Sequence, residues 1–295
     1  MSKPSATQKA NAKINLYLHI TGKRGDGLHT LDSLVVFADV GDTITATPIN
    51  ENPEIIFSTS GPFGNNVPLD ESNLVVRTAK LLQEKYNIKN GARINLEKNL
   101  PPSSGMGGGS ADAAAAMRAL GEIWNIDFSK DNKVELYSVM ASRIGADVPV
   151  CFNGKNVFMG GIGEKLDPAP ILPSCWLLLV NPNIPVSTPA VFSVRKGAFS
   201  ELGRFDISPS NANELADILS LRNNDLSTGA QEIEPEIANV ISALQKLEGV
   251  LLARMSGSGA TCFAIYSNEQ SALMGAQKIA NENPEWWVRA TRMLS

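Results

Sequence analysis

The sequence predicts a protein of two domains that mix helices and strands, of α+β or α/β class. Stretches of strict polar and apolar alternation, typical of strands, are mixed with stretches of helical periodicity, without internal repeats or low-complexity segments. The chain of 295 residues is 43% hydrophobic, enough to bury a sizeable core, and its length favours two domains over one. Glycine and proline are concentrated at 160–175. We therefore place the domain boundary there, with residues 1–160 in the first domain and 161–295 in the second.

The first domain is predicted to begin with strands. The segment AKINLYLHI at 12–20 alternates strictly, so one face is expected in the core and the other, polar face carries Lys13, Asn15, Tyr17 and His19. The turn-rich segment GKRGDGLHT follows, and residues 31–48 give further strand-like stretches before a polar connection that contains proline.

Helical periodicity appears next, at 74–86, directly after an asparagine suited to cap a helix, Asn73. A strand is expected at 92–100, then a glycine-rich loop, an alanine-rich helix and a second helix over 131–144. Residues 145–152 are predicted to form a turn into a short strand.

The second domain shows the same mixture of patterns. We expect a helix around 231–247, then a strand, the segment MSGSGAT at 255–261, the strand CFAIY, and a last helix near 269–282.

Composition excludes several classes of protein. The net charge is -4 and no block of like charges occurs, which argues against nucleic acid or an anionic membrane as a partner. No stretch approaches the roughly 20 apolar residues of a membrane span, and the N-terminus lacks the apolar core of a signal peptide. Cys151, Cys175 and Cys262 have no metal-ligand spacing and are expected to be buried free thiols, so we predict a cytoplasmic protein.

The loop PPSSGMGGGSADAAAAM at 101–117 is the strongest chemical signal. A strand that delivers a glycine run to a helix N-terminus collects backbone N–H groups at the positive end of the helix dipole. The glycines Gly107, Gly108 and Gly109 would let the chain wrap a phosphate, and Ser110 would add a hydroxyl. The spacing is neither that of the P-loop nor that of the Rossmann fingerprint, and a plain structural turn is the alternative.

Three segments together resemble the motifs of the GHMP kinases: AKINLYL, PPSSGMGGGSADAA and MSGSGAT, in that order. The resemblance implies an N-terminal domain of the ribosomal-protein-S5-domain-2-like type, a C-terminal α+β domain and an active site in the cleft between them. It also implies ATP as phosphoryl donor. No acidic cluster suggests a metal cage, so Mg²⁺ is expected to arrive with the nucleotide.

Further stretches, AKINLYLHITGKRGDGLHTLDSLVVFADVGD among them, are similar to one member of that family, which acts on a cytidine diphosphate conjugate of methylerythritol in the non-mevalonate isoprenoid pathway. They imply transfer of the γ-phosphoryl group of ATP to the 2-hydroxyl of that small molecule. No nucleic acid or membrane is expected as partner, and the protein is expected to be a monomer or a weak homodimer.

The resemblance assigns roles residue by residue. Asp147 matches the catalytic aspartate that accepts the hydroxyl proton, and Lys13 matches its lysine partner. Residues matched to the nucleotide site are Asn73, Lys98, Gly105, Gly107, Gly108, Gly109 and Ser110. Residues matched to the substrate site are Asn15, Leu28, His29, Phe192, Gly257, Ser258 and Gly259.

In the substrate set, His29 is expected to read the cytosine edge and Phe192 to stack on the base, while Leu28 stands where some relatives have a tyrosine. A structural role is the alternative for four of these residues: Asn73 as a helix cap, Lys98 as a surface charge, His29 in a loop hydrogen bond and Phe192 in the core. Two other functions stay open. One is another kinase of the family, of homoserine or mevalonate type; the other is a nucleotide-binding regulator without catalysis.

Overall fold

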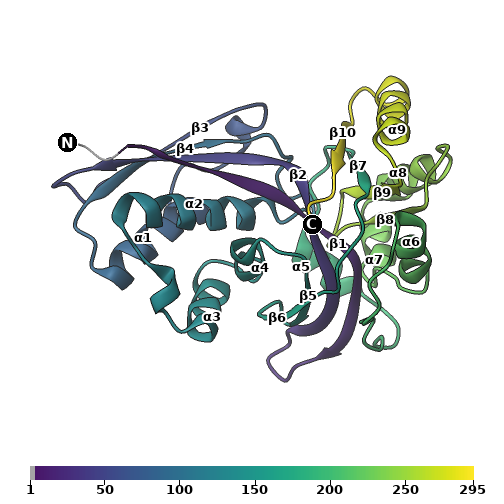
Figure 1. Ribbon diagram of the computed structural model, residues 1–295, viewed down its shortest axis with the longest axis horizontal. Coiled ribbons are helices and arrows are strands. Elements are labelled where there is room, and N and C mark those ends of the chain that lie inside the picture. Colours follow the sequence, from purple (N-terminus) through teal and green to yellow (C-terminus); the bar gives the residue numbers. More distant parts are fainter. Residues whose placement is uncertain (1–3) are drawn as a thin grey trace. The chain divides into compact units, whose positions relative to one another are not determined.

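The computed structural model describes residues 4–295, which form two compact units interleaved along the chain (Figure 1). The first unit contains the described residues up to Ala12, with Gly41–Pro102 and Gly108–Gly154. The second unit contains Lys13–Val40, Ser103–Gly107 and Lys155–Ser295. The chain passes into the second unit for the last time after Gly154, close to the predicted boundary at 160. The short segments 13–40 and 103–107 belong to the second unit as well, so one cut in the sequence does not separate the units.

Two long strands explain the interleaving. β1 (Ala6–Lys23) and β2 (His29–Ile49) pair with each other, and each contributes residues to both units. In the first unit the end of β2 pairs antiparallel with β4 (Gly91–Glu97), which pairs parallel with β3 (Ile55–Ser60). The predicted strands at 12–20, 31–48 and 92–100 are thereby confirmed, and 31–48 belongs to a single strand.

Four helices complete the first unit. They are α1 (Leu74–Tyr86), α2 (Gly108–Trp124), α3 (Lys133–Arg143) and α4 (Val148–Asn153). In α2 the alanine run 113–116 is fully buried, and α2 packs against both α1 and α4. Small side chains permit this close approach.

The prediction of a short strand at 145–152 is wrong, because these residues turn into α4. Pro149 occupies the first turn of the helix, where its missing N–H is harmless, and Gly154 ends the helix in a left-handed conformation. A buried apolar run of this length fits either structure, and only packing against α2 decides between them.

The second unit holds two antiparallel arrangements of strands. The beginning of β2 pairs with β5 (Val157–Gly161), which pairs with β6 (Lys165–Pro168). A separate sheet has the order β10-β7-β9-β8. Its strands are β7 (Trp176–Asn181), β8 (Leu252–Met255), β9 (Cys262–Tyr266) and β10 (Trp287–Arg292).

Helices of the second unit cover this sheet and surround a core that includes Leu178, Val240 and Tyr266. They are α5 (Thr188–Val194), α6 (Ala212–Ser220), α7 (Ser227–Ile233), α8 (Glu236–Gln245) and α9 (Glu269–Glu282). In Figure 1, α6 to α9 lie on one side of the sheet. The last helix agrees with its predicted range, whereas the helix expected over 231–247 is interrupted before Pro235.

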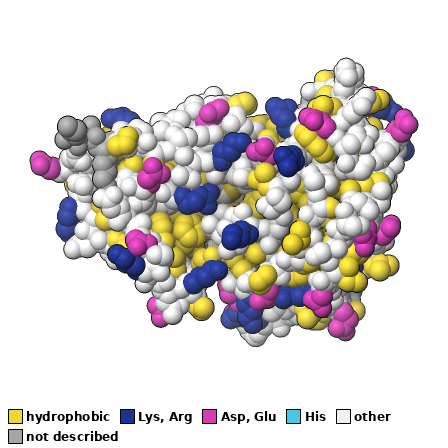
Figure 2. Space-filling model, viewed as in Figure 1, with side chains coloured by type: hydrophobic (Ala, Val, Ile, Leu, Met, Phe, Trp, Pro, Cys, Tyr) yellow, Lys and Arg dark blue, Asp and Glu magenta, His cyan; other side chains and the backbone are white. Residues whose placement is uncertain are grey.

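Both signs of charge are spread over the face that Figure 2 shows, with apolar side chains between them. Cys151, Cys175 and Cys262 are buried free thiols, as predicted. Within residues 4–295, no helix is both long enough and apolar enough to cross a bilayer.

Candidate active site

Backbone and hydroxyl hydrogen bonds join the three motifs inside the second unit. The Lys13 N–H of β1 donates to the Met106 carbonyl of the glycine-rich loop at 2.9 Å. The Ser256 hydroxyl accepts from the Asn15 N–H and donates to the Gly105 carbonyl, both at 3.1 Å. Segments separated by more than 80 residues along the chain thus share one junction, which we call the motif junction.

Glycine is required in the motif junction because backbones approach closely. A Cβ on Gly105 would lie 2.5 Å from the Ser256 carbonyl oxygen, and a Cβ on Gly257 would lie 2.6 Å from the Gly105 oxygen. Both glycines also adopt left-handed φ values, of 75° and 56°. The segment MSGSGAT is therefore a turn between β8 and β9 that supports the start of the glycine-rich loop.

The side chain of Asn224 also holds this turn, and the sequence analysis missed it. Its amide donates to the carbonyls of Met255 at 2.9 Å and Gly257 at 2.8 Å, and its oxygen accepts from the Leu226 N–H. A single asparagine in a loop gives no sequence signal for such a contact. Ser258 is held in turn by the Thr188 hydroxyl, 2.7 Å away at the start of α5.

The helix α2 begins inside the glycine run that was expected to form the loop. Gly105 and Gly107 have positive φ, whereas Gly108, Gly109 and Ser110 already belong to the first turn of α2. The first N–H groups of a helix have no acceptor within it and lie at the positive end of its dipole. This start of α2 therefore has the chemistry of a phosphate site, in agreement with the sequence.

The segment that leads into Asp147 lies near that helix start within the first unit. A Cβ on Gly145, two residues before Asp147, would be 3.7 Å from the Ser110 hydroxyl oxygen. Asp147 immediately precedes α4, yet its side chain makes no capping hydrogen bond. The Asp147 residue is half-buried.

Asn73 and Lys98 are both buried, but their side chains make different contacts. Asn73 caps α1 by accepting from the Val75 N–H at 2.9 Å, and its amide donates to the Pro68 carbonyl. The alternative prediction for Asn73, a helix cap, is therefore confirmed. Lys98 is not a surface charge. It is 2% exposed, and its ammonium contacts Asp42 and Asp112 at 2.6 and 2.7 Å.

The polar face of β1 is buried, contrary to the expectation that strand alternation separates a core face from an open one. Lys13, Asn15, Tyr17 and His19 are each at most 8% exposed. The Asn15 amide donates to the Ser33 hydroxyl at 2.7 Å, while its buried Oδ1 has no hydrogen-bond partner in the protein. Such an orphaned acceptor suits a hydroxyl donor from a ligand.

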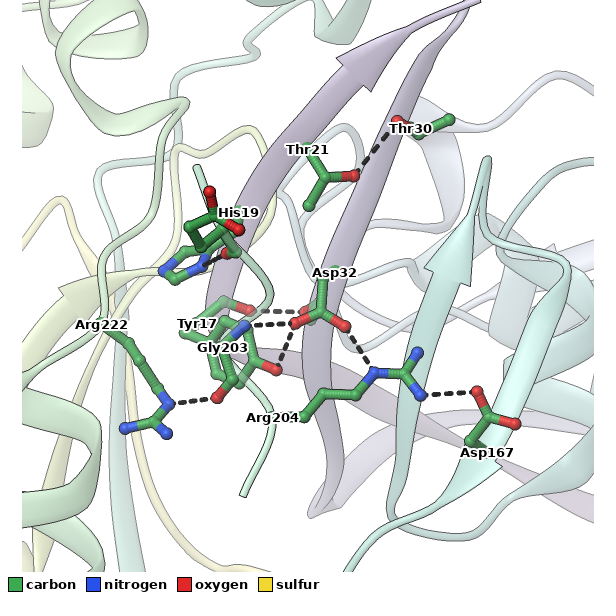
Figure 3. Close-up of polar contacts among 11 residues, drawn as sticks. Tyr17, His19, Thr21, Thr30, Asp32, Asp167, Gly203, Arg204 and Arg222 are labelled. Atoms are coloured by element: carbon green, nitrogen blue, oxygen red, sulfur yellow. Dashed lines mark hydrogen bonds and ion pairs between the residues drawn. The ribbon is translucent and has the colours of Figure 1, made fainter. Parts of the chain in front are cut away.

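Tyr17 and His19 are covered by the segment 199–206, which is anchored on Asp32 (Figure 3). The fully buried Asp32 carboxylate accepts from the Tyr17 hydroxyl at 2.7 Å and from the Gly203 N–H and Arg204 Nε at 2.8 Å. His19 Nδ1 faces the Glu201 carbonyl at 2.8 Å. These two residues of β1 therefore hold the segment in place, and only Lys13 and Asn15 belong to the motif junction.

His29 and Phe192 meet within the second unit, as their shared assignment to the substrate requires. Their ring centroids are 5.3 Å apart and the planes differ by 30°. Both side chains are half-buried, and Leu28 beside them is 49% exposed. Burial, followed by the nearby cations Lys23 and Arg195, lowers the pKa of His29, which favours a neutral imidazole at neutral pH.

The comparisons with known proteins agree with this geometry. Residues 73–155 match the family model of the GHMP kinases N terminal domain, and residues 198–285 match that of the GHMP kinases C terminal. A protein of Paramagnetospirillum magneticum, named 4-diphosphocytidyl-2-C-methyl-D-erythritol kinase, is 44% identical over 97% of this chain and 98% of its own length. A relative of the same name in Rhodospirillum rubrum is also 44% identical, over 98% and 93%.

The chain belongs to the GHMP kinase family. It is similar to the crystal structure of 4-(cytidine 5'-diphospho)-2C-methyl-D-erythritol kinase, with a TM-score of 0.77 and 28% identity over 98% of this chain and 99% of the other. The homoserine kinase of Cytophaga hutchinsonii has a TM-score of 0.72 at 16% identity, over 98% and 95%, which shows a shared fold alone. The predicted two-part α+β GHMP kinase fold and kinase activity are therefore confirmed, and with them the use of ATP.

In this GHMP kinase the predicted residues divide between the units. The first unit holds Asn73, Lys98, Gly108, Gly109, Ser110 and Asp147. The second unit holds Lys13, Asn15, Leu28, His29, Gly105, Gly107, Phe192, Gly257, Ser258 and Gly259. The pairing of Lys13 with Asp147 remains a prediction.

A cavity of about 650 Å³ in the second unit reaches the GHMP motifs only at Met255, the first residue of MSGSGAT. Its lining includes Arg195, Lys196, Glu232 and Arg254, and none of the residues predicted for the kinase site. Lys196 is paired with Glu232 at 3.0 Å, and the Arg195 guanidinium donates to nearby backbone carbonyls. The cavity therefore does not alter the assignment of the site.

Proposed function

We propose that this GHMP kinase transfers the γ-phosphoryl group of ATP to the 2-hydroxyl of 4-diphosphocytidyl-2-C-methyl-D-erythritol, giving the 2-phosphate and ADP in the non-mevalonate isoprenoid pathway. The observation that carries the proposal is the motif junction, in which the Lys13 N–H bonds to Met106 and the Ser256 hydroxyl bonds to Asn15 and Gly105. The substrate follows from the relatives, which are named for it and match nearly the whole chain.

The nucleotide phosphates would be held at the start of α2. Its free N–H groups and the Ser110 hydroxyl are donors, and the glycines leave no Cβ in the way. In our proposal Mg²⁺ enters with the nucleotide and neutralises phosphate charge, because a kinase of this kind needs little more than positioning and electrostatic stabilisation.

Proton transfer would fall to Asp147 and charge stabilisation to Lys13. A carboxylate that follows the Gly145 segment beside Ser110 is suited to accept the proton of an alcohol as the phosphoryl group arrives. The Lys13 ammonium would keep that carboxylate ionised and stabilise the developing charge. Asn15, whose Oδ1 lacks a partner, would accept a hydrogen bond from a substrate hydroxyl.

Cytosine recognition would involve His29, Phe192 and Leu28. A neutral imidazole keeps one nitrogen as donor and the other as acceptor, so either nitrogen could make a single hydrogen bond to the cytosine edge, to its ring acceptor or from its amino group. Because the His29 and Phe192 rings contact each other, the base would stack on the outer face of Phe192 instead of between the two rings. The exposed Leu28 would supply an apolar contact.

We propose Gly257, Ser258 and Gly259 as further substrate contacts, and Asn73 and Lys98 as residues flanking the nucleotide. The same proposal takes the protein to be cytoplasmic, a monomer or weak homodimer, with no nucleic acid or membrane as partner.

The test is ADP release by the purified protein with Mg²⁺-ATP. The cytidyl substrate, free methylerythritol 4-phosphate, homoserine and mevalonate are offered in turn. Release with the cytidyl substrate alone is expected. Release with homoserine or mevalonate would keep the kinase and contradict its substrate, whereas nucleotide binding without turnover would favour a regulator.

Asp147→Ala is the matching variant. We expect turnover to fall by about 10²–10⁴-fold while ATP affinity stays within a few-fold, because only the proton acceptor is lost. Asp206→Ala, at an exposed aspartate, is the control. Full activity of Asp147→Ala would contradict the assignment of the base.

A further inference from the structure

A sealed ion cluster lies at the start of α2 in the first unit. The Lys98 Nζ is 2.6 Å from Asp42 Oδ2 and 2.7 Å from Asp112 Oδ2, and all three residues are at most 2% exposed. The other oxygen of Asp42 accepts from the N–H groups of Asn99 and Leu100 at 2.6 and 2.8 Å. We call Lys98, Asp42 and Asp112 the Lys98 cluster; it connects β2, the end of β4 and α2.

The Lys98 cluster touches the glycine-rich helix start directly. A Cβ on Gly108, the first residue of α2, would lie 3.2 Å from the Lys98 Nζ. Gly108 has no positive φ, so the turn itself does not require glycine at this position. The missing side chain instead allows the first turn of α2 to rest against the ammonium.

The Lys98 cluster has more carboxyl groups than a simple ion pair needs. One carboxylate would be enough for one ammonium, but two carboxyl groups contact it, and Asp112 Oδ1 has no hydrogen-bond partner among the residues that the structure describes. Buried ion pairs seldom stabilise a fold more than apolar side chains of similar volume would. Their clearer effect is to fix geometry, here at the place where the phosphates of the proposed nucleotide would bind.

We propose that Asp42 and Asp112 are positioning residues for nucleotide binding, which act through Lys98 to fix the first turn of α2. This inference rests on the proposed kinase function and adds to it two residues that the sequence motifs leave unassigned. Asp112 holds the ammonium from the helix, Asp42 holds it from β2, and two of the three ammonium protons are committed to these carboxylates. The loop N–H groups then keep one direction before the nucleotide arrives.

Isothermal titration calorimetry with ADP tests the proposal. The wild type is compared with Asp112→Ala, Lys98→Met, their double variant and Asp112→Asn. The binding stoichiometry reports the folded fraction, so the dissociation constant stays interpretable even if a variant is partly unfolded. We expect Asp112→Ala and Lys98→Met each to weaken ADP binding by about tenfold, and the double variant to be no weaker than Lys98→Met. Asp112→Asn keeps an acceptor for Lys98 and should bind ADP within about twofold of the wild type.

Steady-state kinetics supply a second measurement. The KM for ATP should rise in Asp112→Ala, whereas the KM for the cytidyl substrate should stay within about twofold, a split that general destabilisation does not produce. Lys80→Met is the matched control, because it breaks an exposed lysine–carboxylate pair in the same unit.

Two results would overturn the inference alone: unchanged ADP affinity in Asp112→Ala, or losses in Asp112→Ala and Lys98→Met that add in the double variant. Additive losses would mean that Lys98 contacts the nucleotide independently of Asp112. If the wild type itself bound neither ADP nor ATP, the proposed function and the inference would both be wrong.

Discussion

Two buried carboxylate clusters, one in each unit, use similar residues in opposite ways. The Lys98 cluster in the first unit is sealed, has two carboxyl groups for one ammonium and, among residues 4–295, leaves Asp112 Oδ1 without a hydrogen-bond partner. In the second unit the carboxylate of Asp32 has three donors, and its charged partner Arg204 has a 31% exposed side chain. Arg204 also contacts Asp167, whose side chain is half exposed.

This difference indicates two roles. The Asp32 contacts hold a segment in place, whereas the Lys98 cluster, in our proposal, positions a site. Asp32 saturates its hydrogen bonds and attaches the segment 199–206 to β1 and β2, so folding alone accounts for it. The Lys98 cluster leaves one buried carboxyl oxygen without a hydrogen-bond partner among the described residues, and it lies at the start of the helix where a phosphate site is expected. Burial alone would lower the pKa of Lys98, but its two carboxylates outweigh burial and raise it.

The largest effect is expected from removing the cation of the sealed cluster. Lys98→Met leaves two buried carboxylates side by side and should lower the free energy of unfolding by about 3–5 kcal/mol, measured by urea denaturation. The double variant Lys98→Met/Asp112→Ala should recover part of this loss, because only Asp42 remains and it keeps two backbone donors. A double variant less stable than Lys98→Met would contradict the view that the two carboxyl groups destabilise the fold once Lys98 is absent.

A smaller loss is expected at Asp32. Asp32→Ala orphans the buried Tyr17 hydroxyl and Gly203 N–H, but leaves Arg204 with water and Asp167. The free energy of unfolding should fall by about 1–3 kcal/mol. Tyr17→Phe is the control and should lose about 1 kcal/mol, since Asp32 keeps its other donors. ADP affinity should not change in either variant; a loss of ADP affinity would remove the distinction between the two clusters.

Replacing one glycine beside each cluster with alanine tests how firmly the neighbouring side chains are held. A Cβ on Gly203 would lie 2.8 Å from the Tyr17 ring and 3.0 Å from the His19 ring, and hydrogen bonds hold both rings. Gly203→Ala should therefore destabilise by about 1–3 kcal/mol. Gly108→Ala meets only the end of a lysine side chain and should change stability by less than about 1 kcal/mol, while ADP binding weakens. Equal losses of stability in Gly203→Ala and Gly108→Ala would show that the Lys98 side chain cannot move away from the added methyl group.

The smallest effect concerns pH. Burial raises the pKa of Asp112 to about 8, with Asp42 adding to the rise and Lys98 opposing it. The folded state then holds a proton that the unfolded chain, with a carboxyl pKa near 4, releases earlier. This contribution to stability is complete below about pH 4 and is lost as pH rises through about 8. The urea midpoint should therefore fall between pH 6 and pH 9 more in the wild type than in Asp112→Asn; equal declines would show that Asp112 does not titrate there.

Much of the fold and of the site could be predicted from local sequence. Caps, turns and periodicity depend on neighbours within a few residues, so Asn73 at the start of α1, the strand at 92–100 and the last helix were found in this way. The glycine-rich loop and MSGSGAT were recognisable because backbone geometry demands glycine there, as the close approach of Gly105 and Gly257 shows.

The sequence by itself therefore determined the mixture of helices and strands, the glycine-rich loop before a helix, and the resemblance to the GHMP kinases with the α+β fold that it implies. Only the tertiary structure decided that α4 is a helix, that both faces of β1 are buried, and that Lys98 meets Asp42 across 56 residues of chain. The reason is physical: a lysine or an aspartate carries no local pattern that names a distant partner. Whether its charge faces water or another charge depends on which strands and helices enclose it.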